Sequence, residues 1–416
     1  MKKRLNFIIS LTLALALCLN VLSFPALSFE NNVPISSGNV LLINTDTHTV
    51  VYNKNADAKC DSSYLTALMS FLIVCDTAGD IYSTDVEINE EFLDSIPESD
   101  GTLKRFAGNT LTIKDLMVFL LITKGHDAAY VLADYLFDSD IEAFVEKMNE
   151  KAAELGMKDT NYTTPCYDPE REAQTTCRDV YTLYSYALTK DIFKQLSSLS
   201  EYVPDGYDEN TDKVYTEISI MSPNSPYYFR YVENAKYSYD SDAGAALVLT
   251  TKYRNSTYLF VAANGLAEAE ENVYVDAKKL TTWAYLDLSD RKLVEAGDIS
   301  SSVKIDSPWR VDEVTLTTAE SPFRTIPKKY ESAKFSVEFD IPEHVALPVF
   351  EGQGIGSATV LYDGNPIESI PLSSTVSKGI SMLPDLGAFI GAGYASMFPV
   401  TSEKSTKDDS QVELTE

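Results

Sequence analysis

The stretch DSSYLTALMS, residues 61–70, is where residue types and spacing first suggest covalent chemistry. It carries three neighbouring hydroxyl groups, on Ser62, Ser63 and Tyr64. A hydroxyl that attacks a carbonyl needs a base to take its proton, and a lysine three residues later would lie one helical turn away. The residues at that spacing are uncharged: Leu65, Thr66 and Ala67. The stretch therefore predicts a nucleophile position without a base in its own helical turn.

Two later segments carry groups that could compensate. Lys124 and His126 stand before Asp-Ala-Ala, where a helix is expected, and either could act as a base. The alternative for His126 is a helix-capping or solvent-facing histidine. Lys236, followed by Tyr237 and Ser238, could hold a carboxylate or could be a solvated lysine. These residues form the candidate site.

The length and the N-terminus indicate an exported globular protein. A chain of 416 residues with 44% hydrophobic composition can form two or three domains with cores. Residues 1–28 combine a basic start, a long apolar run and a small-residue ending, which predicts a secretory signal peptide, with a retained membrane anchor as the alternative. We therefore expect a secreted or extracytoplasmic protein of the cell envelope.

Charge and composition exclude several classes of function. The formal net charge of −28 disfavours nucleic acid and anionic membrane surfaces as electrostatic partners. With three histidines, no pair at ligand spacing, no CxxC and no glycine-rich phosphate loop, neither a metal site nor a cofactor is expected. A Cys166–Cys177 disulfide and free thiols both remain open.

Periodicity predicts an α+β domain followed by an all-β domain. Strand and helix patterns in residues 29–290 predict a hairpin (40–44 with 49–53), a fully buried helix (65–74), a helix capped by Thr112 and Asp115, a helix over 141–155 and a second hairpin (246–253 with 257–265). Residues 291–378 show short strands between Pro and Gly turns, which predicts a small β-sandwich. In 379–416, the uncharged run 386–400 indicates an interfacial membrane contact or a short packed segment.

Three separated segments resemble one protein family in the same order. Residues 63–70 are similar to the phrase Ala-Ser-Leu-Thr-Lys-Leu-Met-Thr of the D-alanyl-D-alanine carboxypeptidases, the low-molecular-mass penicillin-binding proteins, which share a fold with serine β-lactamases. In this register Tyr64 stands at the nucleophile position and Ala67 at the lysine position. The resemblance spans roughly residues 35–378 and includes the scaffold segments 143–165 and 346–372.

The other two motif segments are also altered. Lys124 and His126 stand where the family has the serine and asparagine of Ser-Gly-Asn. Lys236 matches the lysine of Lys-Thr-Gly, whereas Tyr237 and Ser238 replace the threonine and glycine. The resemblance therefore implies the family fold, without intact catalytic residues.

We expect an exported carboxypeptidase homologue that has lost hydrolysis and binds a peptidoglycan stem peptide or a wall-associated protein. The rival is an active serine-type carboxypeptidase with relocated groups, for example with Lys124 as base for Tyr64 or Ser63. A third alternative is an assembly role of the β-domain alone. Lys236, Lys124, Tyr237 and Ser238 are the expected binding residues.

Overall fold

The computed structural model describes residues 33–97, 101–168, 173–240, 244–265, 271–294, 299–306, 312–318 and 322–379. The chain divides into two compact units. The first contains the residues up to Arg291 and the segment Phe323–Glu331. The second contains Lys292–Pro322 and the chain from Ser332 onwards. The expected signal peptide (1–28) and the run 386–400 lie outside the described residues. The α+β domain and the all-β C-terminal domain expected from the sequence are both confirmed.

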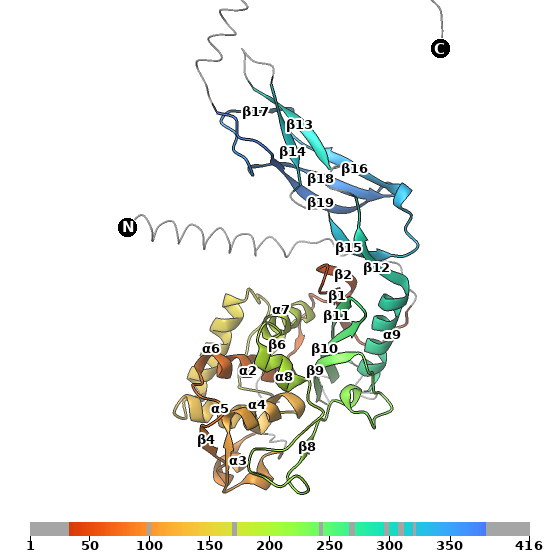
Figure 1. Ribbon diagram of the computed structural model, residues 1–416. Coiled ribbons are helices and arrows are strands. Elements are labelled where there is room, and N and C mark those ends of the chain that lie inside the picture. The colour runs from red at the N-terminus through yellow and green to blue at the C-terminus, as the bar shows by residue number, and fades with distance from the viewer. Residues whose placement is uncertain are drawn as a thin grey trace, which may run out of the picture. The chain divides into compact units, whose positions relative to one another are not determined.

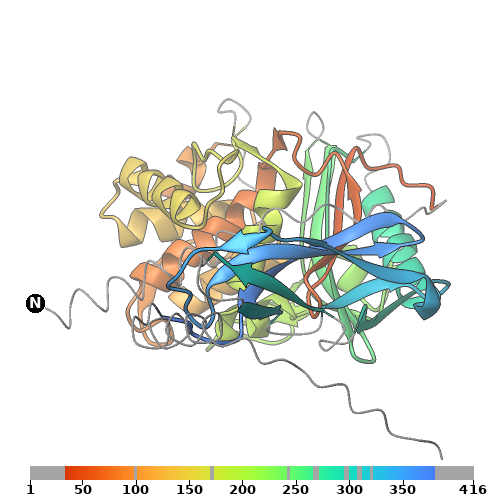
Figure 2. The same cartoon turned by 90° about the horizontal axis from the view of Figure 1, so that it is seen from above.

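The first unit is built on a five-stranded antiparallel sheet in the order β2-β1-β11-β10-β9. Its strands are β1 (Asn39–Asn44), β2 (Thr49–Lys54), β9 (Val232–Asp240), β10 (Gly244–Tyr253) and β11 (Ser256–Ala263). Helix α9 (Asn272–Asp287) covers one face of this sheet and the other helices lie on the opposite side (Figures 1 and 2). All six residues of β1 are buried, as expected for a strand covered on both faces.

The helices on the opposite side form the larger part of the core. They are α2 (Ala67–Thr77), α3 (Glu90–Ser95), α4 (Ile113–Ile122), α5 (His126–Leu136), α6 (Ile141–Glu154), α7 (Cys177–Ala187) and α8 (Asp191–Ser197). Helix α2 follows the 3₁₀ turn η2 (Ser63–Thr66), and its residues from Ala67 to Val74 are all buried. The fully buried helix predicted over 65–74 is therefore confirmed.

Short elements connect these layers. The strand pairs are β3 (Cys60–Asp61) with β6 (Gln174–Thr175), β4 (Asp85–Glu87) with β5 (Thr110–Thr112), β7 (Glu201–Tyr202) with β8 (Val214–Tyr215), and β12 (Leu288–Lys292) with β15 (Phe323–Pro327). The 3₁₀ turns are η3 (Lys104–Phe106), η4 (Ser219–Met221) and η7 (Ser332–Lys334). Both predicted hairpins are confirmed, as β1–β2 and β10–β11.

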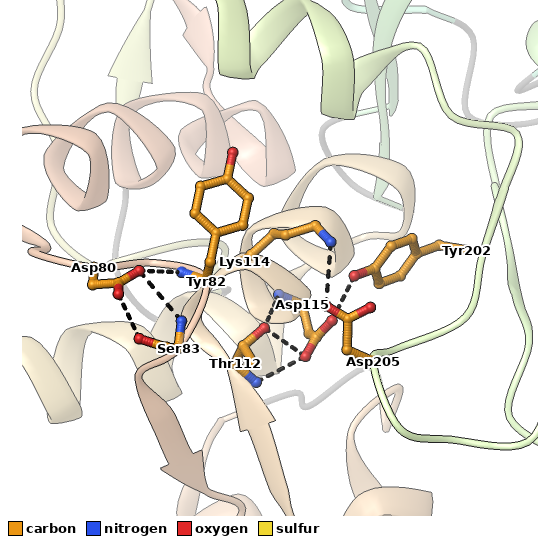
Figure 3. A network of polar contacts seen from close by, with 8 residues as sticks. All are labelled: Asp80, Tyr82, Ser83, Thr112, Lys114, Asp115, Tyr202 and Asp205. Carbon is orange, nitrogen blue, oxygen red and sulfur yellow. Dashed lines mark hydrogen bonds and ion pairs between the residues drawn. The ribbon is translucent and has the colours of Figure 1, made fainter.

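Helix α4 begins at the capping box that the sequence predicted. Thr112 Oγ1 accepts from the Asp115 backbone N–H, while Asp115 Oδ2 accepts from the Thr112 backbone N–H at 2.8 Å. Tyr202 Oη donates to Asp115 Oδ1, and Lys114 Nζ lies 3.5 Å from Asp205 Oδ2 beside it (Figure 3). These contacts fix the start of the helix whose other end carries the second motif segment.

The second unit is all-β. Its six-stranded sheet has the order β16-β18-β19-β14-β13-β17. The strands are β13 (Ser300–Ile305), β14 (Glu313–Thr317), β16 (Phe335–Asp340), β17 (His344–Val345), β18 (Gly354–Tyr362) and β19 (Asn365–Ser374). All neighbouring pairs are antiparallel except β13 with β17.

Two further findings concern the cysteines and the membrane. Cys60, Cys75, Cys166 and Cys177 are all free thiols, so the structure has the second of the two alternatives left open for Cys166 and Cys177. The strand pairing instead places Cys60 opposite Thr175, two residues before Cys177. Within the described parts of the chain, no helix has the length and apolar character needed to cross a membrane.

Candidate functional site

The first motif segment lies in a buried turn that leads into α2. Ser62 is 1% exposed and its Oγ shares a 2.8 Å hydrogen bond with Thr66 Oγ1, so this serine is tied to its own turn. Ala67, at the lysine position, is completely buried in the hydrophobic core. The backbone of Ser63 and Tyr64 lies in η2, which contacts β9, whereas their side chains lie outside what the structure describes.

Lys236, in the middle of β9, is directed into the protein and joins the second and third motif segments. Its side chain is completely buried, and Nζ donates to three backbone carbonyls, at 2.9 Å (Leu120), 2.6 Å (Thr123) and 3.0 Å (Lys124). The last carbonyls of a helix have no partner within the helix, and a cation stabilises that end. The ammonium carries three N–H donors, and these three carbonyls lie within hydrogen-bond distance of it. A substrate carboxylate would therefore have to compete with these carbonyls for the Lys236 ammonium.

The turn between α4 and α5 needs a glycine at its centre. Gly125 has φ +75°, and a Cβ there would lie 2.5 Å from the carbonyl oxygen of Leu120. Only glycine adopts this conformation at such close approach without strain. Thr123 Oγ1 accepts from the Gly125 N–H at 3.1 Å and closes the turn. The glycine of the second motif is therefore retained for a structural reason.

The two residues that flank this glycine have opposite environments. Lys124 is exposed, and its backbone N–H donates to Glu217 Oε2 at 3.1 Å. His126, the first residue of α5, is completely buried, and its Nε2 donates to the Pro97 carbonyl because a carbonyl oxygen can only accept. Its Nδ1 is also buried. Of the two expected bases, only Lys124 faces solvent.

Tyr237 and Ser238 continue β9 past the lysine. The Tyr237 ring is half-buried and lies 5.0 Å, centroid to centroid, from the Tyr274 ring of α9. Ser238 is 1% exposed. Beyond them, Tyr167 Oη donates to Asp240 Oδ2 at 2.6 Å. Sequence reasoning missed this last pair, because its members are 73 residues apart and belong to no motif.

The structure thus gathers the three motif segments at one place. η2 lies against β9, and the Lys236 ammonium holds the turn that carries Lys124. Among the residues described, no group of three or more His, Cys, Asp or Glu side chains could hold a metal ion. The available chemistry is that of one exposed amine and buried hydrogen-bonding groups, without a described pair of nucleophile and base.

Both units of the chain resemble known proteins. The family model of D-alanyl-D-alanine carboxypeptidases matches residues 27–266, and that of the penicillin-binding protein 5 C-terminal domain matches residues 289–377. The chain is 25% identical over 337 residues to D-alanyl-D-alanine carboxypeptidase DacF of Bacillus subtilis, covering 80% of this chain and 84% of that protein. It is also 25% identical over 349 residues to DacA of Haemophilus influenzae, covering 81% and 84% of the two chains.

Solved structures show the same fold. Penicillin-binding protein 5 from Haemophilus influenzae superposes with a TM-score of 0.65 at 21% identity, covering 85% of this chain and all of that one. DacD from Francisella tularensis gives 0.64 at 18% identity, covering 87% and 98%. Since the first family model covers more than half of the chain and the second covers the β-domain, this protein belongs to the D-alanyl-D-alanine carboxypeptidase family of low-molecular-mass penicillin-binding proteins.

Proposed function

We propose that this protein is an exported, catalytically inactive carboxypeptidase homologue that binds peptidoglycan or a wall-associated partner. The proposal rests on which residues stand at the motif positions and on what surrounds them. Ala67 stands in the core in place of the base, while the one retained motif lysine, Lys236, is buried and donates to three backbone carbonyls. A serine-type acyl transfer needs an activated nucleophile, and the described side chains offer none.

The bound ligand is proposed to be the stem peptide of peptidoglycan. The relatives DacF and DacA are named as D-alanyl-D-alanine carboxypeptidases, so their substrate class is a peptide with a D-alanyl-D-alanine end. Lys124 is the exposed cation at the gathered motif segments and would contact the carboxylate of such a peptide. The export and envelope location rest on residues 1–28 and on this family membership.

The intact mass of the mature protein after incubation with penicillin tests the inactivity. We expect no adduct for the wild type, Tyr64→Phe or Ser63→Ala. A mass increase by one penicillin that disappears in either variant would instead identify a nucleophile and establish the rival, an active carboxypeptidase with relocated groups.

Co-sedimentation with purified peptidoglycan tests the binding. Wild type should co-sediment, and Lys124→Ala should reduce the bound fraction. Lys158→Ala, which removes another exposed lysine of the same unit, serves as the matched control. If wild type stays in the supernatant, or if both variants lose binding equally, Lys124 does not recognise the wall.

A further inference from the structure

A cavity of about 350 Å³ lies in the first unit, and none of the motif positions is among its lining residues. Its wall is formed by the β1–β2 turn, by α7 and α8 with the link between them, and by β9, β10 and β11. Figure 1 shows α7 and α8 on the helical side of this sheet, and α7 packs against β11 while α8 packs against β9. The volume is at the lower end of the roughly 300–1,000 Å³ range of small-ligand sites.

The wall is rich in hydroxyl groups. Five lining residues carry aliphatic hydroxyls: Thr45, Ser185, Thr189, Thr250 and Thr257. Thr45 Oγ1 donates to the Thr257 carbonyl at 3.2 Å and Thr189 Oγ1 donates to the Tyr186 carbonyl at 2.7 Å, which leaves their oxygens able to accept. Such a wall can exchange many hydrogen bonds with a ligand that is itself rich in hydroxyls.

The wall also contains two exposed polar side chains, Glu233 and His48, beside these hydroxyl groups. The carboxylate of Glu233, the imidazole of His48 and the hydroxyl of Thr257 line the cavity and have no hydrogen-bond or ion-pair partner within the described part of the chain. His48 and Glu233 are exposed, so both can reach a ligand that enters from solvent. Together they offer donors and acceptors from the β1–β2 turn, β9 and β11.

The charges of the wall disfavour an anionic ligand. Lys194 is the lysine that lines the cavity, and its Nζ lies 3.2 Å from Asp191 Oδ1. Glu233 adds a negative charge to the wall. A phosphate or carboxylate would therefore meet no uncompensated lysine in this wall.

The wall also has an apolar part, formed by Tyr181 and Leu188. The Tyr181 ring is half-buried, and burial raises the pKa of its phenol, so the ring stays neutral at physiological pH. A sugar ring combines hydroxyls at its rim with an apolar C–H face that packs on an aromatic ring. Among neutral ligands of this size, a sugar matches both parts of the wall.

We infer that this cavity binds one N-acetylhexosamine unit of a glycan strand. The inference rests on the proposed peptidoglycan binding and adds a sugar subsite to it, at residues separate from Lys124 and Lys236. Glu233 and Thr257 hydrogen-bond the hydroxyls or the acetamido group, and Tyr181 supports the ring.

Titration of the mature full-length protein with the N-acetylglucosamine trisaccharide, followed by calorimetry, tests the inference. Wild type should bind, and Glu233→Gln and Thr257→Val should each weaken the affinity about fivefold or more, the size expected for one lost hydrogen bond. Glu142→Gln, an exposed glutamate on α6, is the control and should bind as wild type does. Thermal melts of each variant check that the fold is retained.

Peptidoglycan co-sedimentation with the same proteins separates the two proposals. If wild type binds peptidoglycan but not the trisaccharide at millimolar concentration, the sugar subsite is wrong and the proposed function stands. If the trisaccharide binds equally well to Glu233→Gln, Thr257→Val and wild type, the cavity is not the sugar site. If wild type binds neither the trisaccharide nor peptidoglycan, the proposed peptidoglycan binding is wrong as well.

Discussion

Tyr167 and Asp240 join two distant segments through a hydrogen bond in which the phenol donates to the carboxylate Oδ2 at 2.6 Å. Tyr167 lies in the connection between α6 and β6, and Asp240 is the last residue of β9, four positions after Lys236. Both side chains are half-buried. The bond therefore ties the end of the strand that carries the third motif to the helical side of the unit.

Removing this phenol should loosen the end of β9. Tyr167→Phe is expected to lower the free energy of unfolding by about 1 kcal/mol, because one partly buried hydrogen bond to a carboxylate is lost. Hydrogen exchange should become faster in residues 237–240. Tyr228→Phe, in which the tyrosine is 41% exposed, is the control. Equal exchange in the two variants would show that the Tyr167–Asp240 bond does not hold the strand.

Lys236 should be a stability residue. Lys236→Met keeps most of the buried side-chain volume but removes the donor to three carbonyls at the end of α4. We expect the free energy of unfolding to fall by about 3 kcal/mol or more, since each buried carbonyl left without a donor costs about 1–3 kcal/mol. Urea unfolding measures this. Lys124→Met, at the exposed neighbour, should stay within about 0.5 kcal/mol of wild type; similar losses in both would contradict the assignment.

The capping box of α4 allows a similar test at the other end of the helix. Thr112→Ala removes the acceptor for the Asp115 N–H and should cost about 1 kcal/mol of unfolding free energy. Thr110→Ala, an exposed position two residues earlier, is the comparison. The measurement is again urea unfolding, and an equal effect of the two substitutions would argue against a stabilising cap.

The free energy of unfolding should fall at alkaline pH because of the Cys60 thiol. Burial, with a smaller contribution from Asp61, raises the pKa of the Cys60 thiol to about 12 from its ordinary value of 9.0. The folded state thus holds the thiol proton more tightly than the unfolded state. The resulting contribution to the stability of the fold is complete below pH 9.0 and is lost as the pH rises towards 12.

The loss can be measured by comparing two proteins at two pH values. Between pH 7 and about 10.5, wild type should lose about 2 kcal/mol more unfolding free energy than Cys60→Ala, at about 1.4 kcal/mol for each pKa unit. Alkylation of Cys60 in the native protein at pH 8 should also be slow, because the thiolate is the reactive form. Rapid alkylation, or parallel pH profiles of the two proteins, would show that the thiol is not buried in solution.

Local patterns predicted much of the fold. The apolar runs on either side of a turn that build β1–β2 and β10–β11, and the Thr112–Asp115 spacing that starts α4, are set by neighbouring residues and are therefore readable from sequence. The altered motif positions were equally visible, because they required only a comparison of residue types. Whether Cys166 and Cys177 form a disulfide was left open by the sequence, since sequence proximity does not determine which thiols meet; in the structure both are free.

The role of Lys236 could be decided only by the tertiary structure. From sequence, this lysine was equally compatible with a carboxylate ligand and with a solvated side chain. Its acceptors are backbone carbonyls at the end of α4, more than 110 residues away. Every residue has such a carbonyl, so no residue type marks the ones that meet the ammonium. The sequence by itself determined which residue types stand at the motif positions, and only the tertiary structure brought the Lys236 ammonium to the carbonyls at the end of α4.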